Sequence, residues 1–419
     1  MIADTYDPAA SGDTIRSVDV FLVDSGTTKN WLFVKVMTAQ GVTGWGECYT
    51  APDRESAIAS IVSHLTEYLV GRHIYEIRPF LFVAFRDVAT LRGSMEFFAA
   101  LSGLEIALWD IIGKHLGQPV YNLLGGAMQK RLRLYANGWC YQPTGELEKL
   151  PRLLDAATEL VESGYTALKV DPFPGPWRAY PSKSEIVAGL SVLEELRDKL
   201  GPEIDILVEG HRRFAPSVAC RIAKLLEPLE PFWLEEPVAS SNLPGLAEVQ
   251  KATSTPVVTG EDLYTLAAFR EVFERRAANI VNPDVGCCGG ILELTTIAAA
   301  ADAHMVFVAP HCYNSTSVAL AATLHAASLM PNFLITEYFV NFAERSARLT
   351  ASSSITVEGG FAVLGADPGH GVELDEQALR HGAGHPVRRS FLSGHAKATP
   401  PAQRAPISDI TNEVGAPDA

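Results

Sequence analysis

Three short apolar runs that each end near a glutamate constrain the fold of this chain more than any other feature of its sequence. The glutamates are Glu209, Glu235 and Glu261, spaced 26 and 26 residues apart. A strand, a loop, a helix and a second loop of a parallel βα unit need about this length. The equal spacing therefore predicts that the three carboxylates lie at the same end of three neighbouring parallel strands. Three oxygen ligands that converge on one point suit Mg²⁺, so the sequence predicts a magnesium site there.

The three runs are part of a longer alternation of strands and helices. The expected strands are Leu132–Ala136, Ala167–Val170, Ile204–Val208, Phe232–Leu234, Val257–Thr259, Asn279–Val281, Met305–Val308 and Phe333–Thr336. Amphipathic helices are expected between most of them, as at Ser182–Leu200. Eight strands separated by helices favour an α/β fold with a (β/α)₈ barrel of the TIM type over an open doubly wound sheet. Nucleotide binding has little support, because no Gly-x-Gly-x-x-Gly motif stands at a strand–helix turn.

The residues before the barrel have a different pattern. Two strands, Val18–Val23 and Trp31–Val36, are followed by a helical pattern over Phe97–His115 that is apolar on more than one face. Such a helix is expected to be buried between two domains. We predict an α+β domain over residues 1–127, the barrel over 128–350, a segment over 351–385 that returns to the first domain, and a flexible tail or intersubunit arm over 386–419.

Charge and cysteine content limit the partners and the compartment. The formal net charge is −15, which argues against nucleic acid or an anionic membrane as a partner. No run approaches the roughly 20 apolar residues of a membrane span, and the N-terminus lacks the basic and apolar regions of a secretory signal. The six cysteines have no framework spacing, so we expect free thiols in a reducing cytoplasm.

Ionisable residues also stand at the ends of other strands, where a barrel of this type carries its chemistry. Lys169 and Asp171 close the second strand. They are either a structural ion pair, or Lys169 is a base whose pKa is lowered near the metal. His211 shares a strand face with Glu209 and should face the metal site, either as a hydrogen-bonding neighbour of the site or as an acid or base.

Asp284 and His311 follow two adjacent strands. An aspartate beside a histidine fixes the tautomer and raises the basicity of the imidazole, as a general acid or base requires. Beside a divalent metal, such a group suits removal of the proton α to a carboxylate, which forms an enediolate. Protonation on the opposite face then gives racemisation or epimerisation, whereas loss of a β-hydroxyl gives dehydration.

Several motifs along the chain carry a family resemblance. They are Leu104-Glu105-Ile106-Ala107-Leu108-Trp109-Asp110-Ile111 with Leu123-Leu124-Gly125-Gly126, Trp233-Leu234-Glu235-Glu236-Pro237, Gly260-Glu261, Asn282-Pro283-Asp284 with Gly289-Gly290, and Pro310-His311. Together they resemble the enolase superfamily, mandelate racemase subgroup, over about residues 15–385. The resemblance implies that the first domain caps a modified barrel and that Mg²⁺ is held by the three glutamates. It also implies an acid/base dyad of Asp284 with His311, and a Glu337 that hydrogen-bonds the substrate carboxylate.

Two departures from the family pattern narrow the expected reaction. The racemases carry Lys-x-Lys where this chain has Lys169-x-Asp171, which speaks against simple two-base racemisation. A histidine two residues after the first ligand, as His211, is similar to several acid-sugar dehydratases. We therefore predict a Mg²⁺-dependent hydro-lyase, in which Lys169 or His211 removes the α-proton of a sugar acid and His311 acts as the acid.

Three alternatives stay open at this point. A sugar-acid cycloisomerase and an epimerase would start from the same enediolate, and a catalytically silent protein could bind a sugar acid on the same fold. The loops at 24–30 and 48–53 are expected to select the small-molecule substrate. Barrels of this kind often assemble symmetrically, so we expect a homo-oligomer.

Overall fold

The computed structural model describes residues 12–26, 29–142, 147–173, 178–313 and 315–384 of the 419-residue chain. The predicted tail or arm over 386–419 lies outside these ranges. Among the described residues, no helix is both long and apolar enough to cross a membrane.

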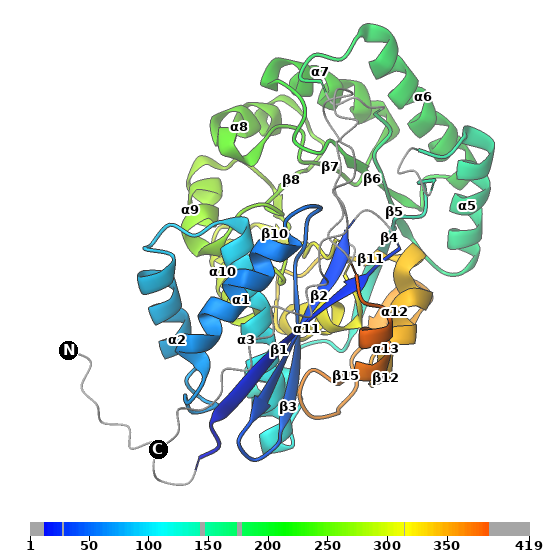
Figure 1. Cartoon of the computed structure of the whole chain (residues 1–419). Coiled ribbons are helices and arrows are strands. Elements are labelled where there is room, and N and C mark those ends of the chain that lie inside the picture. The colour runs from blue at the N-terminus through cyan, green and yellow to red at the C-terminus, as the bar shows by residue number, and fades with distance from the viewer. Residues whose placement is uncertain (1–11, 27–28, 143–146, 174–177, 314, 385–419) are drawn as a thin grey trace, which may run out of the picture.

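The N-terminal part of the chain forms an antiparallel sheet covered by helices (Figure 1). Its elements are β1 (Ile15–Asp24), β2 (Asn30–Thr38), β3 (Thr43–Cys48), α1 (Glu55–Leu69), α2 (Ile77–Val83), the π-helical turn η1 (Ala84–Val88), α3 (Met95–Leu116) and α4 (Val120–Leu123). Helix α3 begins after Ser94, whose side chain accepts a hydrogen bond from Phe97 N, and ends at Gly117, which has a φ of +63°. Most of α3 is buried because it packs on β3 and also contacts the barrel helix α10, which confirms the predicted burial.

All eight expected strands of the barrel are present. They are β4 (Arg131–Asn137), β5 (Ala167–Val170), β6 (Asp205–Glu209), β7 (Trp233–Glu235), β8 (Val257–Thr259), β9 (Ile280–Val281), β10 (Phe307–Val308) and β11 (Thr336–Phe339). Parallel pairing runs from β4 through to β10, and β11 pairs with the other side of β4. A parallel bridge between Val308 and Phe333 brings the two ends of the sheet together.

Helices follow the strands and cover the outside of the barrel (Figure 1). They are α5 (Leu150–Glu162), α6 (Lys183–Leu200), α7 (Pro216–Leu226), α8 (Leu243–Ala252), α9 (Thr265–Arg275), α10 (Ile291–Ala303), α11 (Ser317–Ala327) and α12 (Ala343–Leu349), with 3₁₀ turns η2 (Glu227–Leu229), η3 (Ser240–Asn242) and η4 (Val340–Phe342). Helix α6 begins where the sequence predicts, because Ser182 and Glu185 form a capping box at its first turn.

The barrel interior is filled by one buried side chain from each strand or its immediate flank. These are Tyr135, Ala167, Leu207, Trp233, Val258, Ile280, Ala309 and Ile335. They form a packed apolar floor, so chemistry is confined to the carboxyl ends of the strands.

The eighth strand is displaced from its predicted position. The apolar run Phe333–Thr336 predicts the strand, whereas β11 spans Thr336–Phe339 and so contains Glu337. Pairing with Leu134–Asn137 of β4 fixes this register. The hydrophobic pattern misses it because Glu337 is a charged residue that is fully buried in the strand.

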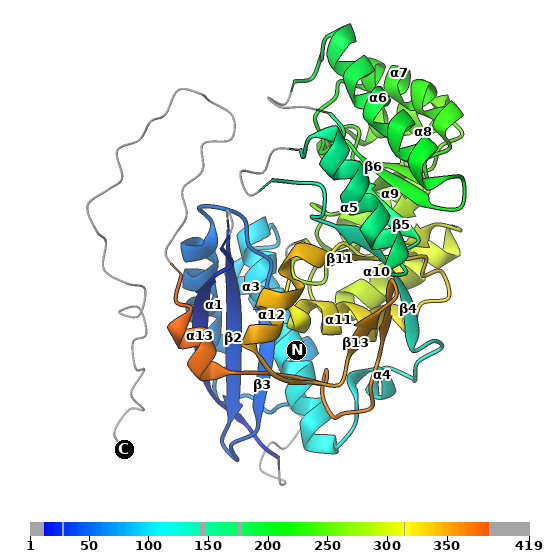
Figure 2. The same cartoon turned by 90° about the vertical axis from the view of Figure 1, so that its right-hand side faces the viewer.

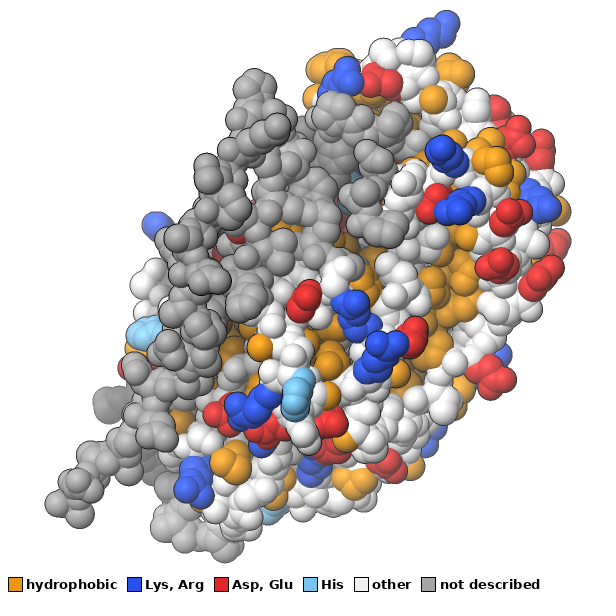
Figure 3. All heavy atoms as spheres, turned by 45° about the vertical axis from the view of Figure 1, so that its right-hand side comes forward, with side chains coloured by type: hydrophobic (Ala, Val, Ile, Leu, Met, Phe, Trp, Pro, Cys, Tyr) orange, Lys and Arg blue, Asp and Glu red, His pale blue; other side chains and the backbone are white. Residues whose placement is uncertain are grey.

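The end of the described chain touches both parts of the molecule (Figure 2). Strands β13 (Thr356–Glu358) and β14 (Phe361–Val363) extend the barrel sheet beside β4. The strand β15 (Val372–Leu374) pairs with β12 (Thr350–Ser353), and α13 (Glu376–His381) packs against β1. On the face shown in Figure 3, basic and acidic side chains are interspersed around hydrophobic ones.

Candidate functional site

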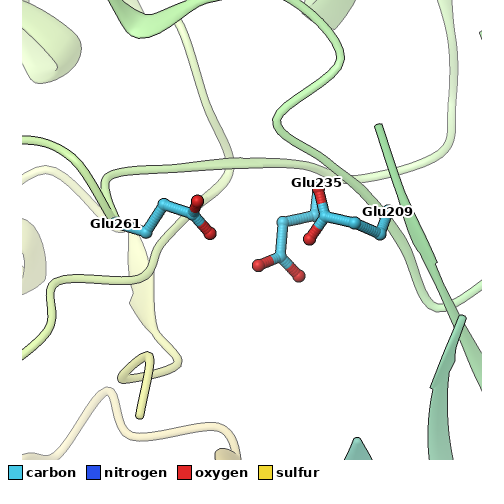
Figure 4. Close-up of side chains that lie close together, drawn as sticks. All are labelled: Glu209, Glu235 and Glu261. Carbon is cyan, nitrogen blue, oxygen red and sulfur yellow. The ribbon is translucent and has the colours of Figure 1, made fainter. Parts of the chain in front are cut away.

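Three glutamates meet at the carboxyl ends of adjacent strands. Glu209 and Glu235 are the last residues of β6 and β7 and are paired in register, and Glu261 follows β8 after Gly260. One carboxylate oxygen from each lies within 4.8 Å of the others (Figure 4). All three side chains are at most 9% exposed, and Glu209 Oε2 has no hydrogen-bond partner among the described residues. Converging, buried carboxylate oxygens are the ligands that Mg²⁺ prefers, so the residues fit the predicted ion.

Lys169 neutralises part of this acidic cluster. Its Nζ lies 2.9 Å from Glu235 Oε1, 2.9 Å from Glu337 Oε1 and 3.4 Å from Glu209 Oε2. Burial alone would lower the pKa of Lys169, but these carboxylates outweigh it and raise the pKa well above its usual value. The lowered pKa expected for Lys169 beside a bound metal stays a prediction. The pairing of Lys169 with Asp171 is wrong, because Asp171 lies beyond the end of β5 and has other partners.

His311 and Asp284 form the predicted pair. The two residues form a parallel bridge just beyond β9 and β10, and His311 Nδ1 lies 2.7 Å from Asp284 Oδ2. His311 Nε2 is 3.4 Å from Glu261 and 3.5 Å from Glu337, so it faces the carboxylate cluster. Burial opposes protonation of His311, but Glu337 and Glu261 together with Asp284 raise its pKa to about 9. The imidazolium form is thus favoured at neutral pH.

Glu337 is held as a carboxylate by donors from three elements. Its Oε1 accepts hydrogen bonds from Asn137 Nδ2 at 2.7 Å and contacts Lys169, and its Oε2 accepts from Cys312 N at 3.0 Å. Burial raises the pKa of Glu337, yet Lys169 and His311 outweigh burial and lower it to about 2. An ionised Glu337 can orient Lys169 and His311 from one side of the barrel.

His211 has a second carboxylate partner that the sequence did not reveal. Its Nδ1 lies 2.6 Å from Asp171 Oδ2, and the same oxygen forms an ion pair with Arg213. Burial lowers the pKa of His211, but Glu209 and the hydrogen bond to Asp171 raise it overall. A sequence signal for this contact was available. Arg213 stands two residues after His211, and the preceding strand ends next to Asp171.

Residues of the first domain also reach the site. Tyr49 of the first domain and Tyr313, which follows β10 of the barrel, have ring centroids 6.4 and 6.0 Å from that of His311. Lys29 Nζ lies 4.4 Å from the ring centroid of Tyr313 and donates a 2.8 Å hydrogen bond to Tyr313 O. Burial lowers the pKa of Lys29 to about 8, although Glu47 opposes the shift. Lys29 and Tyr49 belong to the loops 24–30 and 48–53, which are expected to select the substrate.

Comparison with known families gives two matches that together span most of the chain. The description "Mandelate racemase / muconate lactonizing enzyme, N-terminal domain" matches residues 16–125, and "Enolase C-terminal domain-like" matches residues 152–378. A protein of Streptomyces bingchenggensis named "D-galactonate dehydratase family member" is 32% identical over 88% of this chain and 93% of its own length. The "D-gluconate/D-galactonate dehydratase" of Picrophilus torridus is 32% identical over the same shares.

Solved structures agree with these matches. The mandelate racemase/muconate lactonizing enzyme from Jannaschia sp. CCS1 superposes with a TM-score of 0.84 at 32% identity, covering 90% of this chain and 99% of that one. The corresponding protein from Sulfitobacter sp. gives a TM-score of 0.82 at 32% identity, over 90% and 96% of the two chains. The predicted resemblance and the predicted fold class, a modified barrel with an α+β capping domain, are confirmed.

Proposed function

The chain belongs to the mandelate racemase/muconate lactonizing enzyme family of the enolase superfamily, and on this premise we propose that it is a Mg²⁺-dependent dehydratase of polyhydroxylated sugar acids. The observation that carries the proposal is the placement of two histidines around the glutamate cluster. His211 follows the third strand of the barrel and His311 the seventh, so they stand on opposite sides of an eight-stranded ring. Relatives that are named D-galactonate or D-gluconate dehydratase support a sugar acid as the substrate.

The first step is removal of the proton α to the substrate carboxylate. A bound Mg²⁺ supplies a Lewis acid that offsets the negative charge developing on that carboxylate. Glu209, Glu235 and Glu261 would hold the ion. Either Lys169 or His211 can serve as the base, since both residues stand beside the glutamate cluster.

The second step is departure of the β-hydroxyl. The electron pair left by the α-proton forms the new carbon–carbon double bond, and His311 gives its Nε2 proton to the hydroxyl, which leaves as water. Asp284 holds the other ring nitrogen at 2.7 Å, so that the imidazolium is both oriented and stabilised. The resulting enol tautomerises to a 2-keto-3-deoxy acid.

Epimerisation is the second candidate. Each histidine has its own aspartate partner, at 2.6 Å for His211 and 2.7 Å for His311, and two such bases on opposite faces are what inversion of an α-carbon requires. The two candidates differ only in the fate of the same intermediate, so the product distinguishes them.

The test is a screen of hexonates and hexarates with Mg²⁺, followed by product analysis and by measurement of α-proton exchange in D₂O. We expect a 2-keto-3-deoxy acid from at least one substrate. An inverted α-carbon would refute dehydration in favour of epimerisation. Absence of α-proton exchange for every acid would refute catalysis and favour a binding protein on the same fold.

A further inference from the structure

We infer that Asp171 and Arg213 are positioning residues that lock the His211 ring, which makes His211, Asp171 and Arg213 a second acid/base unit facing the His311–Asp284 pair. The inference deepens the proposed function and rests on it, since it names the residues that aim one of its two histidines.

Asp171 is fixed at both of its oxygens. Its Oδ1 accepts a 3.0 Å hydrogen bond from Phe173 N, and its Oδ2 is shared by His211 Nδ1 and Arg213 Nη2. The Asp171 side chain is 8% exposed and that of Arg213 is 3% exposed, whereas that of His211 is 30% exposed. Asp171 and Arg213 are therefore buried, whereas the imidazole that they hold is partly exposed to solvent.

Arg213 ties the two strand-end loops together. Its Nη1 donates to Phe173 O at 2.7 Å and its Nε donates to Gly210 O at 2.9 Å. One of these carbonyls follows β5 and the other follows β6, so the guanidinium fixes the position of Asp171 relative to the backbone that carries His211. A planar donor fork with three separate acceptors is an arrangement that a lysine cannot reproduce.

The pairing with Asp171 also selects the tautomer. A carboxylate that is ion-paired with Arg213 accepts hydrogen bonds and does not donate, so Nδ1 of His211 carries the hydrogen. Any proton that His211 exchanges with a substrate must then pass through Nε2. Arg213 Nη2 also lies 3.4 Å from His211 Nδ1, a contact that the shorter bond to Asp171 dominates.

The backbone conformation at residues 211 and 212 supports a fixed orientation of the His211 side chain. His211 and Arg212 have φ values of +47° and +60°, a left-handed conformation that residues with a side chain rarely adopt. Strained segments of this kind persist where the surrounding contacts determine them, and they gather at functional sites. A plain ion pair between Asp171 and Arg213 would not require the histidine to be turned toward Asp171.

The geometry repeats on the opposite side of the ring. Asp171 and His211 follow the second and third strands, β5 and β6, and Asp284 and His311 follow the sixth and seventh, β9 and β10. In an eight-stranded ring, each pair lies diametrically opposite the other. Both histidines thus carry an aspartate on Nδ1, and His311 presents its Nε2 to the glutamate cluster, 3.4 Å from Glu261.

The test combines a spectroscopic signature with kinetics. In the native protein we expect a downfield proton resonance from the short Nδ1–H bond, assigned by its loss in His211→Gln. Asp171→Asn should remove this resonance and lower kcat about 10- to 100-fold, the loss expected for one hydrogen bond to a charged group, with KM changed much less. Asp205→Asn is the matched control, because Asp205 forms an arginine pair with Arg133 at 2.7 Å without a histidine.

A second variant keeps the inference testable if Asp171→Asn does not fold. Arg213→Lys retains the positive charge and the Asp171–His211 bond but loses the fork, so the resonance should shift and kcat should fall in the folded variant. Native kcat and an unchanged resonance in either folded variant would overturn the inference. If no acid sugar is turned over at all, the proposed function fails, while the resonance still decides whether Asp171 holds His211.

Discussion

Replacing Asp284 by asparagine should disable His311 without disturbing the glutamate cluster. The buried Asp284 carboxylate lies 2.7 Å from His311 Nδ1, and its other oxygen accepts a 2.8 Å hydrogen bond from Gly286 N. Asparagine has nearly the same shape and can keep the bond from Gly286. It loses the negative charge, and it can turn its amide NH₂ toward Nδ1, which would force the hydrogen onto Nε2 in the neutral ring.

The magnitude of the effect follows from the surroundings of His311. Burial opposes the charge, yet Glu337, Glu261 and Asp284 raise the pKa from 6.5 to about 9, a net preference for imidazolium of about 3 kcal/mol. Removing one charged hydrogen bond forfeits about 1.5–3 kcal/mol, which corresponds to a fall of about 10- to 100-fold in kcat. If the amide holds the wrong tautomer, the fall approaches about 10⁴, as in the comparable variant of a serine protease triad.

The assay is kcat against pH between about 6 and 10 on an acid sugar that the native protein turns over. As an acid, His311 must be protonated, so activity is present below its pKa and is lost as pH rises through about 9. In Asp284→Asn the pH at which this activity is lost, the basic limb of the profile, should move toward the usual histidine pKa of about 6.5. Asp205→Asn, which makes the same chemical change at the start of β6, should leave both kcat and the limb in place. A folded Asp284→Asn variant with native kcat and an unmoved limb would refute the acid role of His311.

Three further predictions concern the metal, the domain interface and acid stability. Glu235→Gln should abolish Mg²⁺ binding in calorimetry and all turnover while leaving the fold intact, and full activity would contradict the metal assignment. Glu105→Ala should lower the free energy of unfolding in urea by at least about 1–3 kcal/mol, because the buried Ile291 N and the part-buried Leu292 N and Trp109 Nε1 lose their acceptor. Burial lowers the pKa of His325 to about 3. The contribution of its neutral ring to the free energy of unfolding is therefore complete above pH 6.5 and falls by about 1.4 kcal/mol per pH unit as the pH drops toward 3. In His325→Gln, urea titrations should show a smaller decrease of the free energy of unfolding between pH 6.5 and 3. An unchanged dependence on pH would show that His325 does not cause the decrease.

The spacing of Glu209, Glu235 and Glu261 was enough to predict the centre of the site. Parallel strands in register carry equivalent residues to one edge, and the structure brings these carboxylates within 4.8 Å of each other. The pairing of Asp284 with His311 followed from the same rule, because their strands are adjacent. These predictions needed only strand order and strand ends, which the hydrophobic pattern contains.

The predictions that failed depended on side-chain direction beyond the strand ends. Lys169 and Asp171 were expected to share a face, yet β5 ends at Val170, and Asp171 turns toward the next loop to meet His211. Lys169 instead meets Glu337, which is distant in sequence but adjacent once β11 pairs with β4. These carboxylates raise the pKa of Lys169.

Two buried glutamates of the capping domain connect it to the barrel near the acid/base pair, because they accept hydrogen bonds from the N-termini of barrel helices. Glu47 of β3 accepts hydrogen bonds from Thr316 N, Thr316 Oγ1 and Ala319 N at the start of α11, and Glu105 of α3 accepts from two backbone N–H groups at the start of α10. These oxygens satisfy backbone N–H groups of a first helical turn, which have no partner within the helix. These two helices come directly after the segments that carry His311 and Asp284. Contacts outside the reaction centre therefore help to hold Tyr49, whose ring centroid lies 6.4 Å from that of His311, so we expect changes in the capping-domain loops to alter the choice of acid without moving the histidine.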